Sequence, residues 1–579
     1  MQEGEVHRSY SGFWVLLRLR IAVLSLVAVL LAASLGGEQA AVVEYDWTVD
    51  YLFVAPDCVE RLIIAINGQF PSPTIQAVQG DTVVVNPKNN LPTEGVTIHW
   101  HGIQQQGTPF YDGAAFVSQC PINPGETFTY KFVVDKSGTY FYHGHLGMQR
   151  AAGLFGSLIV SLPPGEKEPF SYDGEFSLLL TDWYHQSIYL QELGLSSNPF
   201  EFVGEPQSLL IQGRGKYNCS LDLCPVGSPD CLQCNASANA ACAAPFVLPV
   251  QPGKTYRLRL GSVATLSSLN FVIENHNMTV VAADSHYVEP FVVDNLDIYS
   301  GQSYSVLITA NQEPTRNYWV APQSPLWNDF AVTVAQAEKY AAKIGLVSAP
   351  PAKSDRLLIF LTTQNTIDGH IKWAINNISY VPTATPVLAA FKFKLWKAFD
   401  QTPPPDRPPP SDNHLDIFAT PNPNSTYARY GNGVYIFKLG EVVDVVIQNT
   451  NTLNPNNSEI HAWHLHGHDF WVLGYGKGVF DPQTDPAQSY NLVNPPLRNT
   501  QWPSFPTAGW PSGSLLIIPA LGLSTAMWSP ISSWVWVPSL QKAYINCLTS
   551  LPRLWAVASP NQTGDFCDCN PIIPSFIGE

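Results

Sequence analysis

The chain has 579 residues, of which 13% are charged and 12% aromatic, and it contains 49 prolines. This length exceeds what one hydrophobic core supports, and the composition is typical of rigid, loop-rich β domains, so we expect roughly three to four domains. The formal net charge of −16 argues against nucleic acids and anionic membranes as partners.

The first 40 residues have the pattern of a secretory signal peptide. Two arginines, Arg18 and Arg20, precede an apolar run over 21–35, and small residues follow up to Ala41. The run is shorter than the ~20 residues that a membrane-spanning helix needs, so we expect cleavage near Ala40, with a membrane anchor as the alternative. Sequons support a secreted, extracellular glycoprotein. They begin at Asn218, Asn235, Asn277, Asn377, Asn424 and Asn456.

Short β-rich segments, separated by Gly and Pro turns, fill three consecutive blocks. We place them at residues 42–163, 170–345 and 355–579. Such spacing predicts β-sandwiches, and Pro163-Pro-Gly165 is a natural linker. A Gly-polar-x-strand pattern starts at Gly125, Gly301 and Gly440, once in each block. This weak repeat indicates three related sandwiches.

Three histidine pairs carry the main chemical signal of the chain. They are His99 with His101, His143 with His145, and His464 with His466. Residues two apart in a strand point to the same side, so each pair offers two imidazoles to one point in space. Six neutral imidazoles suit copper, nickel, zinc or iron better than calcium or magnesium. The alternative, chance pairs on solvated strands, fits poorly with their apolar, Gly-flanked surroundings.

The motifs around these pairs resemble the first three copper motifs of blue multicopper oxidases. They occupy residues 97–102, 138–145 and 461–468. Further stretches resemble the plant L-ascorbate oxidases of that family. These are residues 107–109, 118–125, 147–150, 212–215, 373–376 and 494–500. The resemblance spans about residues 45–500 and implies an all-β fold of three cupredoxin-like Greek-key sandwiches.

The resemblance also implies a role for each histidine and a reaction. It makes His99 and His464 type 2 copper ligands and His461 a ligand of the type 1 blue copper. It assigns the binuclear type 3 pair to His101, His143, His145 and His466. The implied reaction is one-electron oxidation of ascorbate coupled to four-electron reduction of dioxygen to water. His468 lies beyond the motif's last ligand and is interpreted as structural, and no catalytic residue besides the ligands is assigned.

Aromatic and acidic residues near these motifs allow two interpretations. The resemblance places Trp373 beside the blue copper, where it would stack on the ascorbate ring, with a plain core position as the alternative. Trp183 and Tyr184 form either another wall of that pocket or part of the core, and we favour the core. Asp112 and Glu126 are either proton-delivery groups or solvated turn residues, and neither receives a role.

Ten cysteines in a secreted chain favour disulfide bonds over a zinc site at Cys231 and Cys234. The resemblance implies a bridge from Cys58 to the cysteine cluster at 219–242, with Cys242 as a candidate partner. It also leaves a homodimer open. The segment 321–353 is shorter than its counterpart in the family, which leaves the last strands of the second block undefined.

The fourth motif of the family, His-Cys-His, is missing, and no histidine follows His468. That motif supplies the blue-copper thiolate and two type 3 ligands shortly after residues 494–500. Codons compatible with residues 523–530, read one base earlier, permit F-H-C-H-V-E-P, and the same frame forces two glycines at 534–537. We therefore hypothesise that residues 501–579 are out of frame and scramble the end of the third domain.

Three functions remain open for this chain. The first is a copper-dependent ascorbate oxidase, whose literal sequence is inactive or impaired without the fourth motif. The second is a laccase-like phenol oxidase. The third is a non-enzymatic, copper-poor, cupredoxin-like wall protein.

Overall fold

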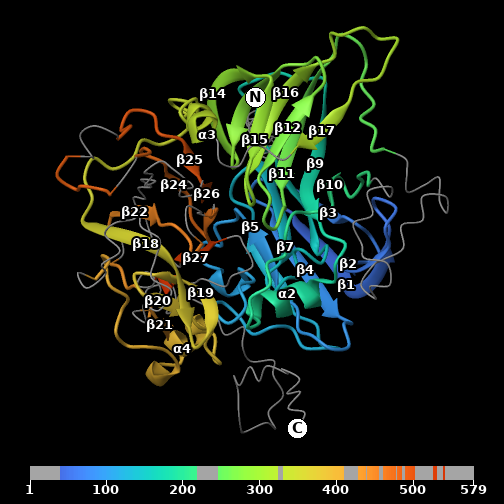
Figure 1. Cartoon of the computed structure of the whole chain (residues 1–579). Coiled ribbons are helices and arrows are strands. Elements are labelled where there is room, and N and C mark those ends of the chain that lie inside the picture. The colour runs from blue at the N-terminus through green and yellow to red at the C-terminus, as the bar shows by residue number, and fades with distance from the viewer. Residues whose placement is uncertain are drawn as a thin grey trace, which may run out of the picture.

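Strands dominate the computed structural model, in which they form three groups of sheets that follow one another along the chain (Figure 1). The structure describes residues 40–217, 245–323, 330–409, 428–438, 440–454, 459, 461–476, 479–484 and 490–501, and the backbone of 526–530 and 539–540. The all-β expectation is confirmed. The signal-peptide prediction and nearly all of the tail after Gln501 lie outside the described residues.

The first unit is a sandwich of two four-stranded sheets, ordered β2-β1-β4-β6 and β3-β8-β7-β5. Its elements are β1 (Val42–Val54), β2 (Arg61–Ile66), β3 (Ser72–Val78), β4 (Thr82–Asn89), β5 (Ile98–His101), η1 (Pro109–Tyr111), β6 (Tyr130–Val133), β7 (Gly138–Gly144) and β8 (Phe155–Ser161). In β6, Tyr130 and Phe132 are buried while the residues between and after them are exposed. This alternation is the period of a half-buried strand.

The second unit joins a six-stranded sheet, β10-β9-β11-β16-β13-β14, to a three-stranded sheet, β15-β12-β17. Its elements are β9 (Gly174–Trp183), α2 (Ile188–Ser196), β10 (Ser208–Ile211), β11 (Thr255–Ser262), β12 (Leu269–Ile273), β13 (Met278–Ala283), β14 (His286–Val293), β15 (Asn295–Ile298), β16 (Ser303–Thr309), β17 (Val320–Gln323) and α3 (Phe330–Ala337). Strand β17 and helix α3 fall in the short segment 321–353, and Tyr340 from that segment joins the core of this unit.

The third unit contains a five-stranded sheet, β21-β20-β19-β18-β22, and shorter sheets that include β26-β23-β27-β28 and β24-β25. Its elements are β18 (Arg356–Ile367), β19 (His370–Ile375), β20 (Ile378–Tyr380), α4 (Val387–Lys392), η3 (Trp396–Ala398), β21 (Arg429–Gly431), β22 (Val443–Asn449), β23 (Trp463–Leu465), β24 (Phe470–Trp471), β25 (Leu497–Arg498), β26 (Thr500–Gln501), β27 (Ala526–Pro530) and β28 (Ser539–Leu540).

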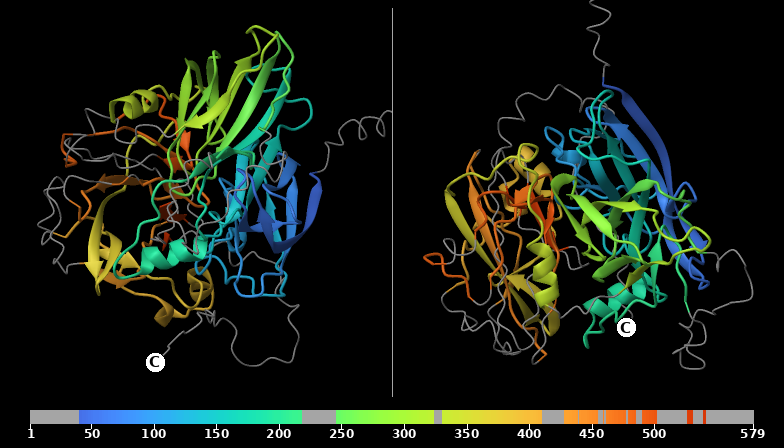
Figure 2. Two further views of the ribbon diagram at one scale, coloured as in Figure 1. Left: turned by 45° about the vertical axis from the view of Figure 1, so that its right-hand side comes forward. Right: turned by 90° about the horizontal axis from the view of Figure 1, so that it is seen from above.

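The three units enclose the strands that carry the histidine pairs. Strands β5 and β7 lie near the middle of the molecule, and β26 and β27 of the third unit lie beside them in two directions of view (Figures 1 and 2). Every residue of β5 and β7 is buried, because these strands are covered by the other units as well as by their own sandwich. The fold therefore places the histidine pairs at the junction of the units.

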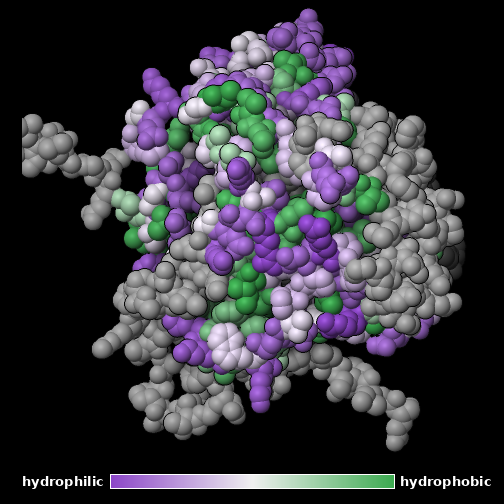
Figure 3. Space-filling model, turned by 90° about the vertical axis from the view of Figure 1, so that its left-hand side faces the viewer, coloured by the Kyte–Doolittle hydropathy of each residue, from purple (hydrophilic) through white to green (hydrophobic). Residues whose placement is uncertain are grey.

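The outer surface differs from this interior. On the face that carries the third unit, hydrophilic side chains cover most of the described area and apolar ones lie in scattered patches (Figure 3). Among the described residues, no helix combines the length and apolar character needed to cross a bilayer.

Candidate metal centre

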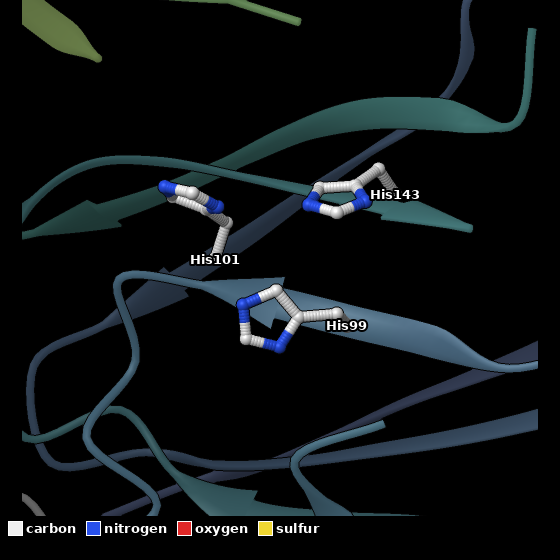
Figure 4. Close-up of side chains that lie close together, drawn as sticks. All are labelled: His99, His101 and His143. Atoms are coloured by element: carbon white, nitrogen blue, oxygen red, sulfur yellow. The ribbon is translucent and has the colours of Figure 1, made fainter. Parts of the chain in front are cut away.

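Two of the histidine pairs come from neighbouring segments of the first unit: His99 and His101 lie on β5, His143 lies on β7, and His145 directly follows β7. In the antiparallel pairing of β5 with β7, His99 lies directly opposite His143. The rings of His99, His101 and His143 point toward one another, and a ring nitrogen of each lies within 4.8 Å of the others (Figure 4). Because the two strands are hydrogen-bonded along this stretch, the backbone itself sets the spacing of these rings.

The third pair reaches the same place from the third unit. His464 on β23 brings its Nε2 atom to 3.3 Å from Nε2 of His99. His99, His464 and His466 form a second group with nitrogens within 4.8 Å of one another. The ring of His145 completes the set, with its centroid 5.0 Å from that of His466. All six predicted histidines therefore converge, and we call them the histidine centre.

Hydrogen bonds on the outer side of four rings orient them inward. In each case Nδ1 donates to an oxygen, which leaves Nε2 facing the other rings. The bonds run from His99 to the Asp112 carbonyl (2.8 Å), from His143 to the Gly144 carbonyl (2.9 Å), from His464 to the Asn499 carbonyl (2.7 Å) and from His466 to the Asp112 carboxylate (2.9 Å). Metal-binding histidines are held by such acceptors in the same manner.

Asp112 is a member of the centre to which sequence reasoning assigned no role. Its carboxylate accepts from His466 and also lies 3.3 Å from Nδ1 of His99. Burial raises its pKa, but the positive charge available on His99 and His466 outweighs burial and holds the pKa well below the usual range. Glu126 instead lies exposed at a turn, bonded to Asn123. Only the tertiary contacts show that Asp112 lies beside the histidines whereas Glu126 lies on the surface.

A glycine explains how Asp112 reaches the histidines. Gly113 has a φ of +85°, and a Cβ there would lie 1.8 Å from the carbonyl oxygen of Ile98, the first residue of β5. No side chain fits at this position, so the chain passes close against β5 only because residue 113 is glycine. This close passage sets Asp112 beside His99.

Electrostatics favour the neutral form of five of the six rings. Burial, together with positive charge on neighbouring groups, lowers the pKa well below the ordinary range for His101, His143, His145 and His464, and to about 4 for His466. A neutral imidazole has a free lone pair at neutral pH, and metal binding needs that lone pair.

His461 lies apart from the six, next to the predicted substrate residue. Its ring is 4.4 Å from that of Trp373, centroid to centroid, in an edge-on arrangement. Its Nε2 is buried without a hydrogen-bond partner among the described residues, and burial lowers its pKa to about 4. Trp373 is only 3% exposed and belongs to the core of the third unit. It therefore lies beside His461 as expected, but as a core residue.

The remaining predicted residues lie elsewhere. Trp183 packs in an apolar cluster with the Arg61 guanidinium 4.2 Å above its ring, and Tyr184 is 4% exposed, which supports the core interpretation. His468 turns its Nδ1 to the carbonyl of His466. Cys58 is disulfide-bonded, but Cys242 lies outside the described residues, so that pairing stays a prediction.

The donor set fits copper. Six imidazoles converge, five of them buried, and two buried ring nitrogens, Nδ1 of His101 and Nε2 of His461, have no partner among the described residues. Buried polar atoms are normally satisfied, so these atoms point to an absent partner. Neutral imidazoles favour copper over hard cations. The individual ligand assignments stay predictions.

Comparisons with known proteins agree with this geometry. Three family models, each described as multicopper oxidase, match residues 48–165, 174–344 and 402–506. The chain is 53% identical over 489 residues to an L-ascorbate oxidase of Cucumis sativus, covering 79% of this chain and 81% of the relative. It is 50% identical to an L-ascorbate oxidase of Cucurbita maxima, covering 83% and 86%.

Laccases are more distant relatives. Laccase-2 of Oryza sativa subsp. japonica is 30% identical and covers 83% of this chain and 88% of its own length. Among solved structures, a mutant of the laccase from B. aclada superposes with a TM-score of 0.67 at 25% identity, covering 89% of each chain. The six-histidine junction, the three-unit all-β fold and these similarities together show that the chain belongs to the multicopper oxidase family, with three cupredoxin-like domains and copper as its cofactor.

Proposed function

We propose that this protein is a copper-dependent L-ascorbate oxidase that couples one-electron oxidation of ascorbate to reduction of dioxygen to water. The observation that carries the proposal is the convergence of six histidines from two units, in a chain about half identical to curated ascorbate oxidases over most of its length. When bound, copper supplies the one-electron chemistry that organic side chains lack.

The residues of the chain provide a dry and oriented environment for that chemistry. His99, His101 and His464 are at most 3% exposed, so bulk water does not reach these donors. Asp112 accepts the Nδ1 proton of His466 on its carboxylate and that of His99 on its backbone carbonyl, which fixes both rings with Nε2 inward.

Ascorbate is favoured over a phenol as the electron donor. The L-ascorbate oxidases match at 48–53% identity, whereas the laccases match at 30–32%. Trp373, edge-on to His461, is the residue that we assign to ascorbate binding, although reaching its buried face requires neighbouring side chains to move.

The sequence after Thr500 limits the copper chemistry of the 579-residue chain. The sequence lacks His-Cys-His, so the blue site has His461 but no thiolate partner from that motif. Strand β27 runs beside β23 with Ser529 opposite His464. Residues 523–530, which permit F-H-C-H-V-E-P in the other frame, thus include a strand adjacent to the histidine centre. We propose that the frame-restored chain is the active oxidase.

Secretion to the cell wall, glycosylation and a homodimer belong to the same proposal. The signal-peptide pattern supports secretion, and Asn277, one of the sequon asparagines, is exposed. The scattered apolar surface in Figure 3 supplies no argument for a dimer on that face.

Two measurements test the function. Sequencing the transcript across codons 495–550 decides the frame: a His-Cys-His codon run is expected, and a clean open frame as printed contradicts the hypothesis. Oxygen consumption by the frame-restored protein is then compared on ascorbate and on a methoxyphenol. Preference for the phenol would reassign it to the laccases, and full copper loading with neither activity would favour the non-enzymatic alternative.

The substrate role of Trp373 has its own test. In the restored enzyme, Trp373→Phe is expected to raise KM for ascorbate while leaving the copper content unchanged, because the residue is not a ligand. An unchanged KM would return Trp373 to a purely structural role.

A further inference from the structure

The second unit supplies none of the six histidines, yet one of its turns contacts β7, the strand of His143, and two segments of the third unit that lie next to the histidine centre. This turn, residues 284–286, joins β13 to β14 and has left-handed backbone at Asp284 (φ +44°) and Ser285 (φ +64°). Left-handed backbone at two successive non-glycine residues is uncommon and marks a turn that its surroundings hold in place. We call it the 284–286 turn.

Asp284 makes the strongest of these contacts. Its side chain is fully buried, and Oδ2 accepts hydrogen bonds from Arg498 Nε at 2.8 Å and from the backbone N–H of Thr500 at 3.1 Å and of Asn499 at 3.3 Å. Its other oxygen accepts from the backbone N–H of Ser303 at 2.9 Å. One carboxylate of the second unit thus forms hydrogen bonds with three consecutive residues of the third unit.

Residues 498–500, which Asp284 binds, also contact two histidines from different units. The Asn499 carbonyl accepts from Nδ1 of His464 at 2.7 Å, and Thr500 Oγ1 lies 3.1 Å from the same atom. Thr500 Oγ1 also lies 2.9 Å from Nε2 of His101. A shift of residues 498–500 would therefore rotate one ring from the first unit and one from the third.

The other two residues of the turn contact β7 and Asp469, which follows His466 by three positions. Ser285 Oγ exchanges hydrogen bonds of 3.0 Å with the backbone of Thr139 on β7, the strand of His143. A Cβ on Gly138 would lie 2.3 Å from Ser285, so this approach needs glycine there. His286 Nε2 lies 3.0 Å from Asp469, which also accepts from Gln104.

We propose that Asp284 is a positioning residue of the histidine centre: through residues 498–500 it sets the orientation of His464 and His101. This inference rests on the proposed copper function of the centre but adds a requirement that no histidine motif contains. A carboxylate that receives a guanidinium and three backbone N–H groups is held by charge-assisted hydrogen bonds, which are the stronger and more directional kind. The second unit, on this view, determines the geometry of ligands it does not supply.

The test compares two buried aspartates in the full-length chain. Asp284→Asn removes the charge at nearly constant shape. The matched control is Asp182→Asn, because Asp182 is also buried and accepts from three consecutive backbone N–H groups, at 2.7–2.9 Å, but touches no histidine segment. Each protein is stripped of metal and titrated with Cu(II), and the bound Cu(II) is examined by electron paramagnetic resonance.

Asp284→Asn is expected to weaken Cu(II) binding by about 10–100-fold and to change the copper hyperfine splitting, as loss of an orienting partner does at other metal sites. Asp182→Asn is expected to keep the wild-type Cu(II) affinity and spectrum, even if its melting temperature falls as much as that of Asp284→Asn. Equal behaviour of the two variants, or a wild-type spectrum in Asp284→Asn, overturns the proposal.

A second pair of variants covers the case in which Asp284→Asn does not fold. Thr500→Val removes the hydroxyl that contacts both rings and should alter the copper spectrum, whereas Thr500→Ser retains the hydroxyl and should restore it. Identical spectra for the two overturn the link through residue 500. If neither the wild-type chain nor its frame-restored form binds Cu(II), the proposed copper function fails; if they bind normally and only the variants behave alike, the positioning role alone fails.

Discussion

Replacing Asp112 by asparagine should weaken metal binding at the histidine centre without unfolding the protein. The carboxylate accepts from Nδ1 of His466 at 2.9 Å and lies 3.3 Å from Nδ1 of His99, whose own hydrogen bond goes to the Asp112 backbone carbonyl, so the side chain orients the His466 ring and places its charge beside the His99 ring. An amide oxygen can accept from one ring, but the neutral amide loses the charge assistance and turns an N–H₂ group toward the other. Loss of such a partner typically lowers metal affinity by about 10–100-fold. That range corresponds to about 1.4–2.7 kcal/mol.

The assay is competition between the metal-free full-length chain and a chelator of known Cu(II) affinity, at pH 7 and fixed salt. Glu126→Gln is the matched control, since Glu126 is exposed and its carboxylate accepts from nearby Asn123. The Cu(II) affinity of Asp112→Asn should be at least tenfold lower than that of wild type, and the affinity of Glu126→Gln should be within twofold of wild type. An Asp112→Asn affinity within twofold of wild type would refute the reasoning from orientation.

Three further outcomes are expected. Gly113→Ala should destabilise the chain by about 3 kcal/mol or more, because its Cβ meets the Ile98 carbonyl, whereas Gly125→Ala, with φ +81° and open space, should cost only about 1–2 kcal/mol in urea unfolding. Burial raises the pKa of Asp469, but His286 and Lys136 lower it overall to about 2, so ionised Asp469 contributes roughly 2–3 kcal/mol that is present above about pH 4 and lost as the pH falls toward 2. Asp469→Asn should therefore be destabilising at pH 7 and nearly neutral at pH 2, and an equal effect at both would contradict this. The literal chain loaded with copper should show no intense blue absorption band, because that band needs a cysteine thiolate on copper and the His-Cys-His motif is absent.

The fold class and the histidine pairs could be predicted because both depend on local rules. Side chains in a strand alternate with a period of two residues, so each His-x-His segment predicts two rings on one side before any tertiary contact is known. The long motifs around the pairs identified the family for the same reason, since each is contiguous in the chain. The similarity of the chain to ascorbate oxidases then follows the same contiguous segments.

The contacts that only the structure reveals join residues far apart in the chain. His99 and His464 are 365 positions apart, and the sequence around either residue does not predict that the two rings meet. Asp112 and Glu126 look alike in sequence, but a close passage at Gly113 sets one beside β5 while the other lies on the surface. Trp373 is equally ambiguous until packing shows it buried against His461.

The sequence by itself thus predicted which side chains are candidate metal donors, of which His99, His101, His143 and His464 lie on strands while His145 and His466 directly follow strands. The packing of three units decided how those donors meet and what holds them. The 284–286 turn illustrates the difference: nothing in Asp-Ser-His predicts that Asp284 binds residues 498–500, because that contact spans 214–216 positions. Such a contact exists only after the second and third units have docked, since a buried carboxylate is stable only when the donors that satisfy it are already in place.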